Sequence, residues 1–279
     1  MEIRMNQKVR KRWKLVKWLT SLVFISLFIL LLTNCKRTTT HGNDVQIALY
    51  SDQGADEECI KATMNMFKWM GYTVVLVKAN LINNEGLGNF NVLCVPGGNM
   101  YQYAQDISSE GKEKIRDFII NGGAYIGICG GAYFTGENVF WQGNQLPILP
   151  LGIFQGTTIG PIDDIAPYPE CTMCKVNIVD SAHYITQAEQ DTTWICYCYG
   201  PFFVPDSSAN IDILGRYDIG NQPMMLSFDY GSGKVVIIGT HPEFEEDSER
   251  DGLPPIEELD DRGSDWDLMK KAVFWCLKK

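Results

Sequence analysis

Basic side chains are scarce over most of this 279-residue chain. Residues 1–35 hold seven lysines and arginines and one acid, which leaves 17 basic against 33 acidic residues in the rest. A body with a net charge near −16 repels phosphate backbones, which argues against nucleic-acid binding as its main function. Histidine is rarer still: His41, His183 and His241 are the only three, so the choice of a general base is narrow.

Internal repeats and long linkers are also lacking. The composition is 45% hydrophobic, 21% charged and 11% aromatic, as in globular proteins rather than disordered or fibrous ones. The simplest organisation is a leader over residues 1–35, a polar tether over 36–43 and a single α/β domain over 44–279 with a sizeable core.

No charged residue occurs from Trp18 to Cys35, directly after the basic segment. A basic stretch followed by an apolar run is typical of a secretory signal. Its end, Leu32-Thr33-Asn34-Cys35, resembles a bacterial lipobox, which implies lipidation of Cys35, although Asn34 replaces the usual Gly, Ala or Ser. The alternative is an uncleaved N-terminal signal anchor. In both cases the basic cluster stays inside, so we expect an extracytoplasmic, membrane-anchored protein of the cell envelope.

Strands and helices alternate in the first half of the body. Apolar runs predict strands at 45–50, 73–78, 91–95 and 124–128, and helical periodicity predicts helices at 56–70 and 109–120. Strands that are apolar throughout and separated by helices indicate a parallel sheet covered on both faces.

The second half is richer in β-branched and aromatic runs separated by Pro and Gly. These runs predict an antiparallel extension of the sheet, with a hairpin turn at 230–234 and strands at 152–159, 175–179, 193–204, 211–217, 224–230 and 234–238. A final helix should begin after a cap at Ser264 or Asp265 and end near Leu277. Its expected buried stripe is Trp266, Met269, Val273, Phe274 and Leu277.

Cys129 is the best candidate nucleophile of the chain. It lies in Gly127-Ile128-Cys129-Gly130-Gly131, directly after a predicted strand. Glycines beside a strand-to-helix elbow remove the clashes of a tight turn, and the helix that follows would favour a thiolate. The alternative is a small buried residue beside a tight turn.

Two further segments end predicted strands and could complete a catalytic site. In Thr240-His241-Pro242-Glu243, residues i and i+2 share a side, so Glu243 can hydrogen-bond one nitrogen of His241 while the other faces a thiol. In Pro96-Gly97-Gly98, an N–H of Gly97 or Gly98 can bind a developing oxyanion together with the N–H of Gly130. The alternatives are a solvated histidine in an acidic loop and a flexible turn.

In this order, the three motifs resemble the class I glutamine amidotransferase superfamily, which implies a flavodoxin-like doubly wound sheet and a triad of Cys129, His241 and Glu243. A closer resemblance is to the family named for the N-terminal domain of eukaryotic biotin–protein ligases, whose elbow continues as Gly-Ala-Tyr, as 131–133 does here. The segment 199–203 is similar to that family's aromatic Gly-Pro strand, and the similarity covers about 45–279. The family name does not imply biotin ligation, because neither a ligase nor a synthetase domain is expected in this chain.

One departure from the superfamily concerns the substrate. Its glutaminases usually carry Gln four residues after the nucleophile, where this chain has Tyr133, and free glutamine is therefore not the expected substrate. The residues that we expect to line a substrate pocket are Tyr133, Tyr199, Gly200 and Phe202.

The remaining cysteines have several possible roles. The pairs Cys171-x-x-Cys174 and Cys196-x-Cys198 could form a disulfide, remain as thiols or bind zinc. Cys59, Cys94 and Cys276 fall on apolar faces and are expected in the core. The ten acids of 243–261 are expected in a solvated loop, and their spacing matches no calcium-binding loop.

The leading hypothesis is a thiol hydrolase that acts on an amide or peptide-like bond, without a cofactor or metal. Cys129 would attack, His241 would transfer the proton and Glu243 would orient the imidazole. If the site lies beneath the acidic segment, neutral or cationic amides are favoured over anionic ones. The alternatives are a non-catalytic binding or scaffolding module with the same pocket and a redox protein that uses Cys171 and Cys174.

Overall fold

A nine-stranded sheet is the centre of the structure, a computed structural model that describes residues 45–245, 248–255, 259 and 263–278. The predicted leader, the lipidation site Cys35 and the tether at 36–43 lie outside these residues. Within the described ranges, no helix combines the length and the apolar character needed to cross a membrane.

Half of the sheet is parallel, as predicted. Its parallel strands, in spatial order, are β2 (Thr73–Val77), β1 (Gln46–Tyr50), β3 (Val92–Val95), β4 (Ala124–Ile128) and β13 (Gly233–Ile238). The predicted antiparallel extension continues from β13 as β12 (Pro223–Tyr230), β11 (Asp212–Tyr217), β8 (Thr172–Ile178) and β9 (Thr192–Tyr197). Because β13 pairs with β4, the carboxyl ends of these two strands lie side by side.

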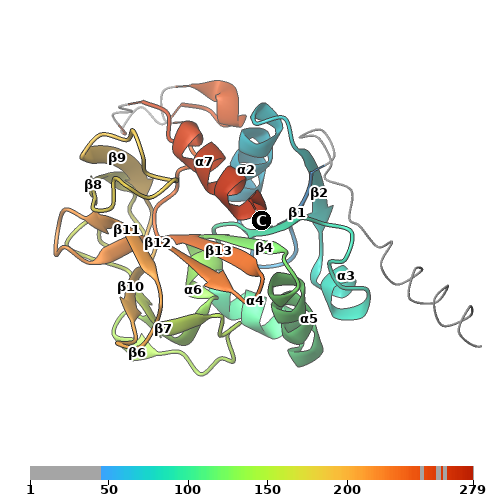
Figure 1. The fold of residues 1–279 in the computed structure, drawn as a ribbon. Coiled ribbons are helices and arrows are strands. Elements are labelled where there is room, and N and C mark those ends of the chain that lie inside the picture. Colours follow the sequence, from blue (N-terminus) through green and yellow to red (C-terminus); the bar gives the residue numbers. More distant parts are fainter. Residues whose placement is uncertain (1–44, 246–247, 256–258, 260–262, 279) are drawn as a thin grey trace, which may run out of the picture. The chain divides into compact units, whose positions relative to one another are not determined.

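Helices cover both faces of the parallel half, with α2 and α7 on one face and α4, α5 and α6 on the other (Figure 1). Alternate residues of β1 serve the two faces: Ile47 and Leu49 pack in the cluster with α2 and α7, and Ala48 and Tyr50 in the cluster with α3 and α5. The bounds of these helices are α2 Glu57–Trp69, α3 Ala79–Asn84, α4 Met100–Asp106, α5 Ser109–Ile120, α6 Gly130–Tyr133 and α7 Trp266–Leu277. The prediction of a doubly wound α/β fold is thus confirmed.

Local capping explains why α2 begins where it does. The Oδ1 atom of Asp56 accepts hydrogen bonds from the N–H groups of Glu58 at 2.9 Å and Cys59 at 3.1 Å. The helix ends before Gly71, whose φ of +86° favours glycine. The predicted helix is therefore confirmed, and the Asp56 side chain caps its first turn.

A second, four-stranded sheet within the described residues corrects two predictions. The run 152–159, which was expected in the extension of the main sheet, belongs to this second sheet as β7 (Phe154–Gly160). The prediction of a continuous strand over 193–204 is wrong, because the chain leaves β9, passes Tyr199 at a φ of +48° and enters a different sheet. The second sheet consists of β10 (Phe202–Pro205), β7 (Phe154–Gly160), β5 (Gly136–Trp141) and β6 (Asn144–Gln145). Its strands β5 and β6, like the short helices α3 and α4, span too few periods to be predicted.

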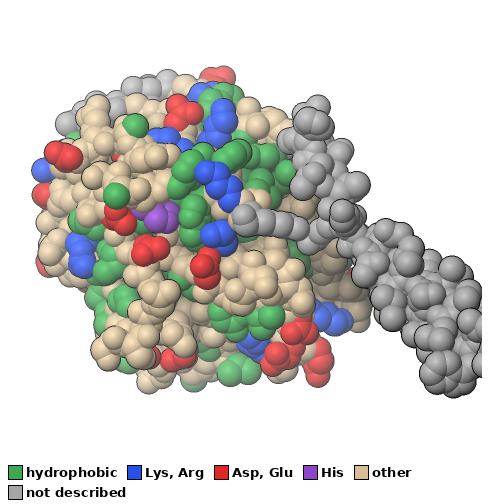
Figure 2. Space-filling view, in the orientation of Figure 1, with side chains coloured by type: hydrophobic (Ala, Val, Ile, Leu, Met, Phe, Trp, Pro, Cys, Tyr) green, Lys and Arg blue, Asp and Glu red, His purple; other side chains and the backbone are tan. Residues whose placement is uncertain are grey.

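The buried stripe of α7 also differs from the prediction. Met269 is fully buried, but Phe274 is 48% exposed. At roughly 100° per residue, Phe274 points about 140° away from Met269. Hydrophobic side chains are interspersed with lysines and arginines over this part of the surface (Figure 2), and Lys278 lies over the Phe274 ring at 4.9 Å. The core side of the helix is instead completed by Leu268, Ala272 and Cys276.

Two alanine substitutions in α7 test this orientation. Met269→Ala should lower the free energy of unfolding by about 2–5 kcal/mol, because it leaves a cavity in the core. Phe274→Ala should lower it by about 1 kcal/mol or less, because the ring is half exposed. Urea denaturation of the two variants measures both values, and equal losses would contradict the orientation.

Candidate active site

Cys129 lies in a strained elbow between β4 and α6. Its φ of +47° and ψ of −103° are unusual for a residue with a side chain. The N–H of Cys129 donates to the carbonyl oxygen of Ile238 at 2.9 Å, and the N–H of Gly131 donates to that of Pro96 at 3.0 Å. The predicted elbow is therefore present and is held from both sides. The helix after it is a single turn, so its macrodipole at the sulfur is small.

Close contacts explain the glycines after Cys129. A Cβ atom at Gly130 would lie 2.2 Å from the carbonyl oxygen of Gly98, and one at Gly131 would lie 1.9 Å from that of Val95. Neither separation is sterically possible, so only glycine allows the elbow to contact the turn after β3.

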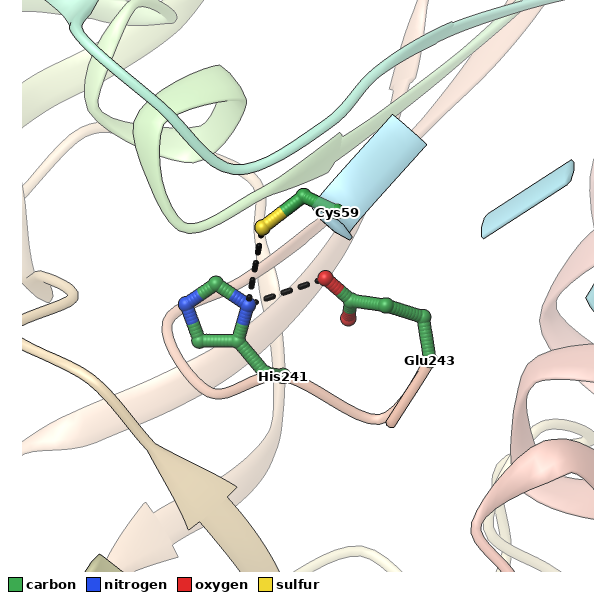
Figure 3. A group of neighbouring side chains, drawn as sticks. All are labelled: Cys59, His241 and Glu243. Carbon is green, nitrogen blue, oxygen red and sulfur yellow. Dashed lines mark hydrogen bonds and ion pairs between the residues drawn. The ribbon is translucent and has the colours of Figure 1, made fainter. Parts of the chain in front are cut away.

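The predicted pair of His241 and Glu243 follows β13. The His241 Nδ1 atom lies 2.9 Å from Glu243 Oε1, and the two side chains are 4% and 0% exposed (Figure 3). Since the carboxylate can only accept, Nδ1–H donates this hydrogen bond. The other ring nitrogen, Nε2, remains able to donate or accept a proton. The ring also stacks on Phe244, with centroids 5.1 Å apart and an interplanar angle of 7°. Its orientation is thus fixed by a hydrogen bond and by packing.

Cys59 is a neighbour of this pair that the sequence did not reveal. We expected it in the core, where it is indeed buried, but its Sγ atom also lies 3.8 Å from His241 Nδ1 (Figure 3). The signal for this contact is not local: an isolated bridge between Ala55 and Gly98 brings the start of α2 to the turn after β3. Burial raises the pKa of the Cys59 thiol to about 12, so it is neutral at pH 7 and a poor nucleophile.

The ligand atoms of Cys59, His241 and Glu243 lie within 4.8 Å of one another. Sulfur, imidazole nitrogen and carboxylate oxygen are all ligands of zinc. Here, however, Nδ1 and Oε1 already share a proton at hydrogen-bonding distance. A metal could bind only by replacing that proton, so the arrangement favours an oriented imidazole over a metal centre.

The pKa of His241 is raised well above its ordinary value of 6.5. Burial opposes the charged ring, but electrostatic interactions with Cys129 and Glu243, and a smaller one with Cys59, outweigh it. The buried Nε2 has no described partner within normal hydrogen-bonding distance. A hydrogen-bond interaction with the Cys129 side chain nevertheless contributes to the raised pKa, and both residues line the same cavity. The ring can therefore hold a proton near the sulfur and donate it from Nε2.

The expected oxyanion donors lie beside Cys129. Gly98, with a φ of +144°, lines the cavity, and no described group accepts a hydrogen bond from the N–H of Gly98 or Gly130. Gly97 has a different place, because a Cβ atom there would lie 2.7 Å from His241 Cε1 and 2.6 Å from Cys59 Sγ. Gly97 therefore permits close packing against the imidazole, and its role as an oxyanion donor stays a prediction.

A cavity of about 720 Å³ opens at Cys129 and His241. Of the four residues expected to contact substrate, Tyr133 and Tyr199 line it. Gly200 and Phe202 do not: Gly200 packs against the backbone of Gly239, and Phe202 packs against the core. Two residues that the sequence did not single out, Trp141 and Tyr168, also line the cavity.

A disulfide joins Cys171 and Cys198 in the lining of the cavity. This pairing selects one of the alternatives that the sequence left open. Cys174 and Cys196 are not part of the disulfide, so a four-cysteine zinc site is not formed. The carbonyl oxygen of Cys198 lies 3.6 Å from Cys129 Sγ, and the disulfide is thus directly beside the candidate nucleophile.

The acidic segment after His241 is not uniformly solvated. Among its described acids, Glu243, Glu245 and Asp251 are buried. The Asp251 carboxylate accepts hydrogen bonds from the N–H groups of Glu245 at 3.0 Å and Leu253 at 2.8 Å. The prediction of a solvated loop is wrong for these residues, because His241 pairs with Glu243, Arg250 pairs with Glu245, and backbone N–H groups bond Asp251.

Comparison with known proteins identifies related sequences. A family model described as "Biotin-protein ligase, N terminal" matches residues 45–263. A biotin–protein ligase of Schizosaccharomyces pombe is 25% identical over 234 residues, which cover 78% of this chain but 36% of that protein. An uncharacterised protein of Chlamydia muridarum is 30% identical over 134 residues, 44% of this chain and 52% of the relative. The chain thus spans about a third to a half of the length of these relatives.

Solved structures share the fold. A putative ThuA-like protein from Bacteroides uniformis superposes with a TM-score of 0.58 at 13% identity, over 88% of this chain and 96% of that one. A glutamine amidotransferase from Thermotoga maritima superposes with a TM-score of 0.56 at 12% identity, over 86% and 100%. The predicted amidotransferase-like architecture is confirmed by these similarities.

The electrostatics of the site can be tested at His241. Cys129→Ala should lower the pKa of the imidazole more than Cys59→Ala, because Cys129 is the largest of the groups that raise it. NMR titration of labelled histidine measures both shifts, with His241→Gln to assign the resonance. An unchanged pKa in Cys129→Ala would show that the sulfur and the ring do not interact.

Proposed function

This chain belongs to the biotin-protein ligase N-terminal family, and on that premise we propose that it is a cysteine-dependent hydrolase of amide or peptide-like bonds. The observation that carries the proposal is the orientation of His241. Its Nδ1 is bonded to buried Glu243, while Nε2 has no described partner and the ring lines the cavity with Cys129. These three side chains would supply the nucleophile, the base and the orienting carboxylate that thiol hydrolysis uses, which supports the proposal.

The reaction follows from the roles of these groups. The Cys129 thiolate attacks the carbonyl carbon, and the electron pair of the carbonyl moves to its oxygen, where the N–H groups of Gly98 and Gly130 would bind it. As the C–N bond breaks, His241 gives its Nε2 proton to the departing amine. Water then attacks the thioester while Nε2 removes a proton, and cleavage of the C–S bond releases the acid and restores the thiolate.

Tyr133 shapes the choice of substrate. Its hydroxyl donates to the carbonyl oxygen of Tyr199 at 3.1 Å, which ties the elbow to the chain after β9. Glutaminases of the superfamily usually carry a glutamine at this position, four residues after the nucleophile. In this chain the position is occupied by the aromatic ring of Tyr133. We therefore propose an amide other than free glutamine.

The compartment belongs to the same proposal. A basic segment, an uncharged apolar run and Cys35 in a lipobox-like sequence support anchoring at the outer side of the cytoplasmic membrane. The Cys171–Cys198 disulfide adds support, because disulfides persist in oxidising compartments.

The anchoring can be tested by metabolic labelling with an alkyne-bearing fatty acid. The full-length protein should take up the label, and Cys35→Ser should not, while Cys276→Ser serves as the control. Label on neither protein, with both retained in the membrane fraction, would indicate a signal anchor in place of a lipoprotein. Recovery of both in the cytosolic fraction would contradict the envelope assignment.

The catalytic proposal can be tested with an electrophilic amide mimic. The protein should be labelled at one cysteine, Cys129→Ala should abolish the labelling, and Cys276→Ala should leave it unchanged, since Cys276 does not line the cavity. Mass spectrometry of the intact protein and its peptides measures both. Undiminished labelling of Cys129→Ala would refute the assignment of the nucleophile. Labelling at Cys129 without turnover of any amide in a broad panel would favour the binding module.

A further inference from the structure

Three aromatic rings form one corner of the cavity. Their centroids are 5.5 Å apart for Trp141 and Tyr168, 6.3 Å for Trp141 and Tyr199, and 5.2 Å for Tyr168 and Tyr199. The corresponding interplanar angles are 82°, 86° and 75°. All three rings line the same cavity, and rings at such angles can present their faces to one common point of it.

Apart from His241, the charged side chains that line the cavity are all acidic. Asp56, Glu57 and Glu58 line it, and none of its described lining residues is Lys or Arg. Asp56 is engaged in capping α2, but the carboxylates of Glu57 and Glu58 are exposed and form no ion pair with a described Lys or Arg. The cavity therefore attracts cations and disfavours anions.

The reacting groups and the aromatic corner belong to one space. The carbonyl oxygen of Cys198, the residue before Tyr199, lies 3.6 Å from Cys129 Sγ. The pKa of Tyr199 is raised by burial and by the charge of Cys129, so the phenol lies within electrostatic range of the thiol. His241 lines the same cavity, and a hydrogen-bond interaction with the Cys129 side chain contributes to the raised pKa of its ring.

From these observations we propose that the corner of Trp141, Tyr168 and Tyr199, in a cavity that Glu57 and Glu58 also line, binds an alkylated ammonium group of the substrate. The inference rests on the proposed function and narrows its substrate to an amide that carries such a cation. Aromatic faces attract a cation within about 6 Å of the ring centroid, and the spacing of the three rings suits simultaneous contact. An alkylated ammonium suits this corner better than a primary amine. Its positive charge is spread over its methyl groups, and those methyl groups can contact the ring faces directly.

Choline and its neutral isostere 3,3-dimethyl-1-butanol provide a matched pair of probes. Choline should bind the full-length protein about tenfold more tightly, which corresponds to about 1.4 kcal/mol of cation recognition. Isothermal titration calorimetry measures both affinities, and the fluorescence of the tryptophans gives a second readout. Equal affinity of the two probes, or no binding of either, would overturn the proposed subsite.

Matched variants locate the binding within the molecule. Tyr168→Leu should weaken choline binding about three- to tenfold, whereas Phe274→Leu, which alters an exposed ring of α7, should not. The double variant Glu57→Gln and Glu58→Gln should weaken binding and reduce its dependence on salt, whereas Glu110→Gln in the first turn of α5 should change neither. Loss of binding in the control variants, or none in the cavity variants, would place the cation elsewhere and overturn the proposal.

The Cys129→Ala variant separates the subsite from the chemistry. It should bind choline as the unmodified protein does, because the rings and carboxylates are unchanged. Choline binding without labelling of Cys129 would leave the subsite standing and refute the hydrolase. Labelling of Cys129 without preference for choline over the neutral isostere would refute the subsite and leave the hydrolase.

Discussion

The close contact between two glycine turns is the constraint on which the site depends. The elbow after β4 meets the turn after β3 at backbone distances that exclude a Cβ atom on Gly130 or Gly131. Gly97, in the same turn, packs against the imidazole of His241 and the sulfur of Cys59. The proposed nucleophile, oxyanion donor and base are therefore positioned by backbone contacts between turns at the ends of strands.

The carboxylate of Glu243 is fully buried beside His241. A fully buried carboxylate is costly unless a positive charge and hydrogen bonds compensate it. His241 supplies both through Nδ1, and the indole N–H of Trp266 bonds the Glu243 carbonyl oxygen at 3.0 Å, which fixes the backbone. The same pairing keeps the imidazole protonated, as donation to a leaving amine requires. The buried Glu243–His241 pair thus contributes both to stability and to the proposed donation of a proton by His241.

The sequence predicted those parts of the site that are encoded locally. Cys129 between glycines, and His241 two residues from Glu243, are recognisable because an elbow and an extended segment impose short-range spacing. Cys59 was assigned to the core, since nothing in its helix shows that an isolated bridge between Ala55 and Gly98 brings it to His241. Contacts between segments more than a hundred residues apart depend on strand order, which periodicity does not encode.

The same distinction applies to the fold. The parallel strands and the helices α2 and α5 were predicted because each spans several periods of one pattern. The run 193–204 was predicted as one strand because β-branched and aromatic residues continue on both sides of Gly200-Pro201. The structure divides it at Tyr199, whose positive φ turns the chain from one sheet to the other. That turn places the ring in the cavity, so the largest error in the predicted secondary structure falls at a residue of the proposed subsite.

The Cys171–Cys198 disulfide links two segments that contribute rings to the cavity. Cys171 lies three residues after Tyr168, and Cys198 immediately precedes Tyr199, so the bond between them joins two of the three segments that form the aromatic corner. Ordering such segments has an entropic cost, which a covalent link reduces before any ligand binds. The parallel sheet therefore positions the reacting groups, and the disulfide preorganises the irregular segments that would select the substrate.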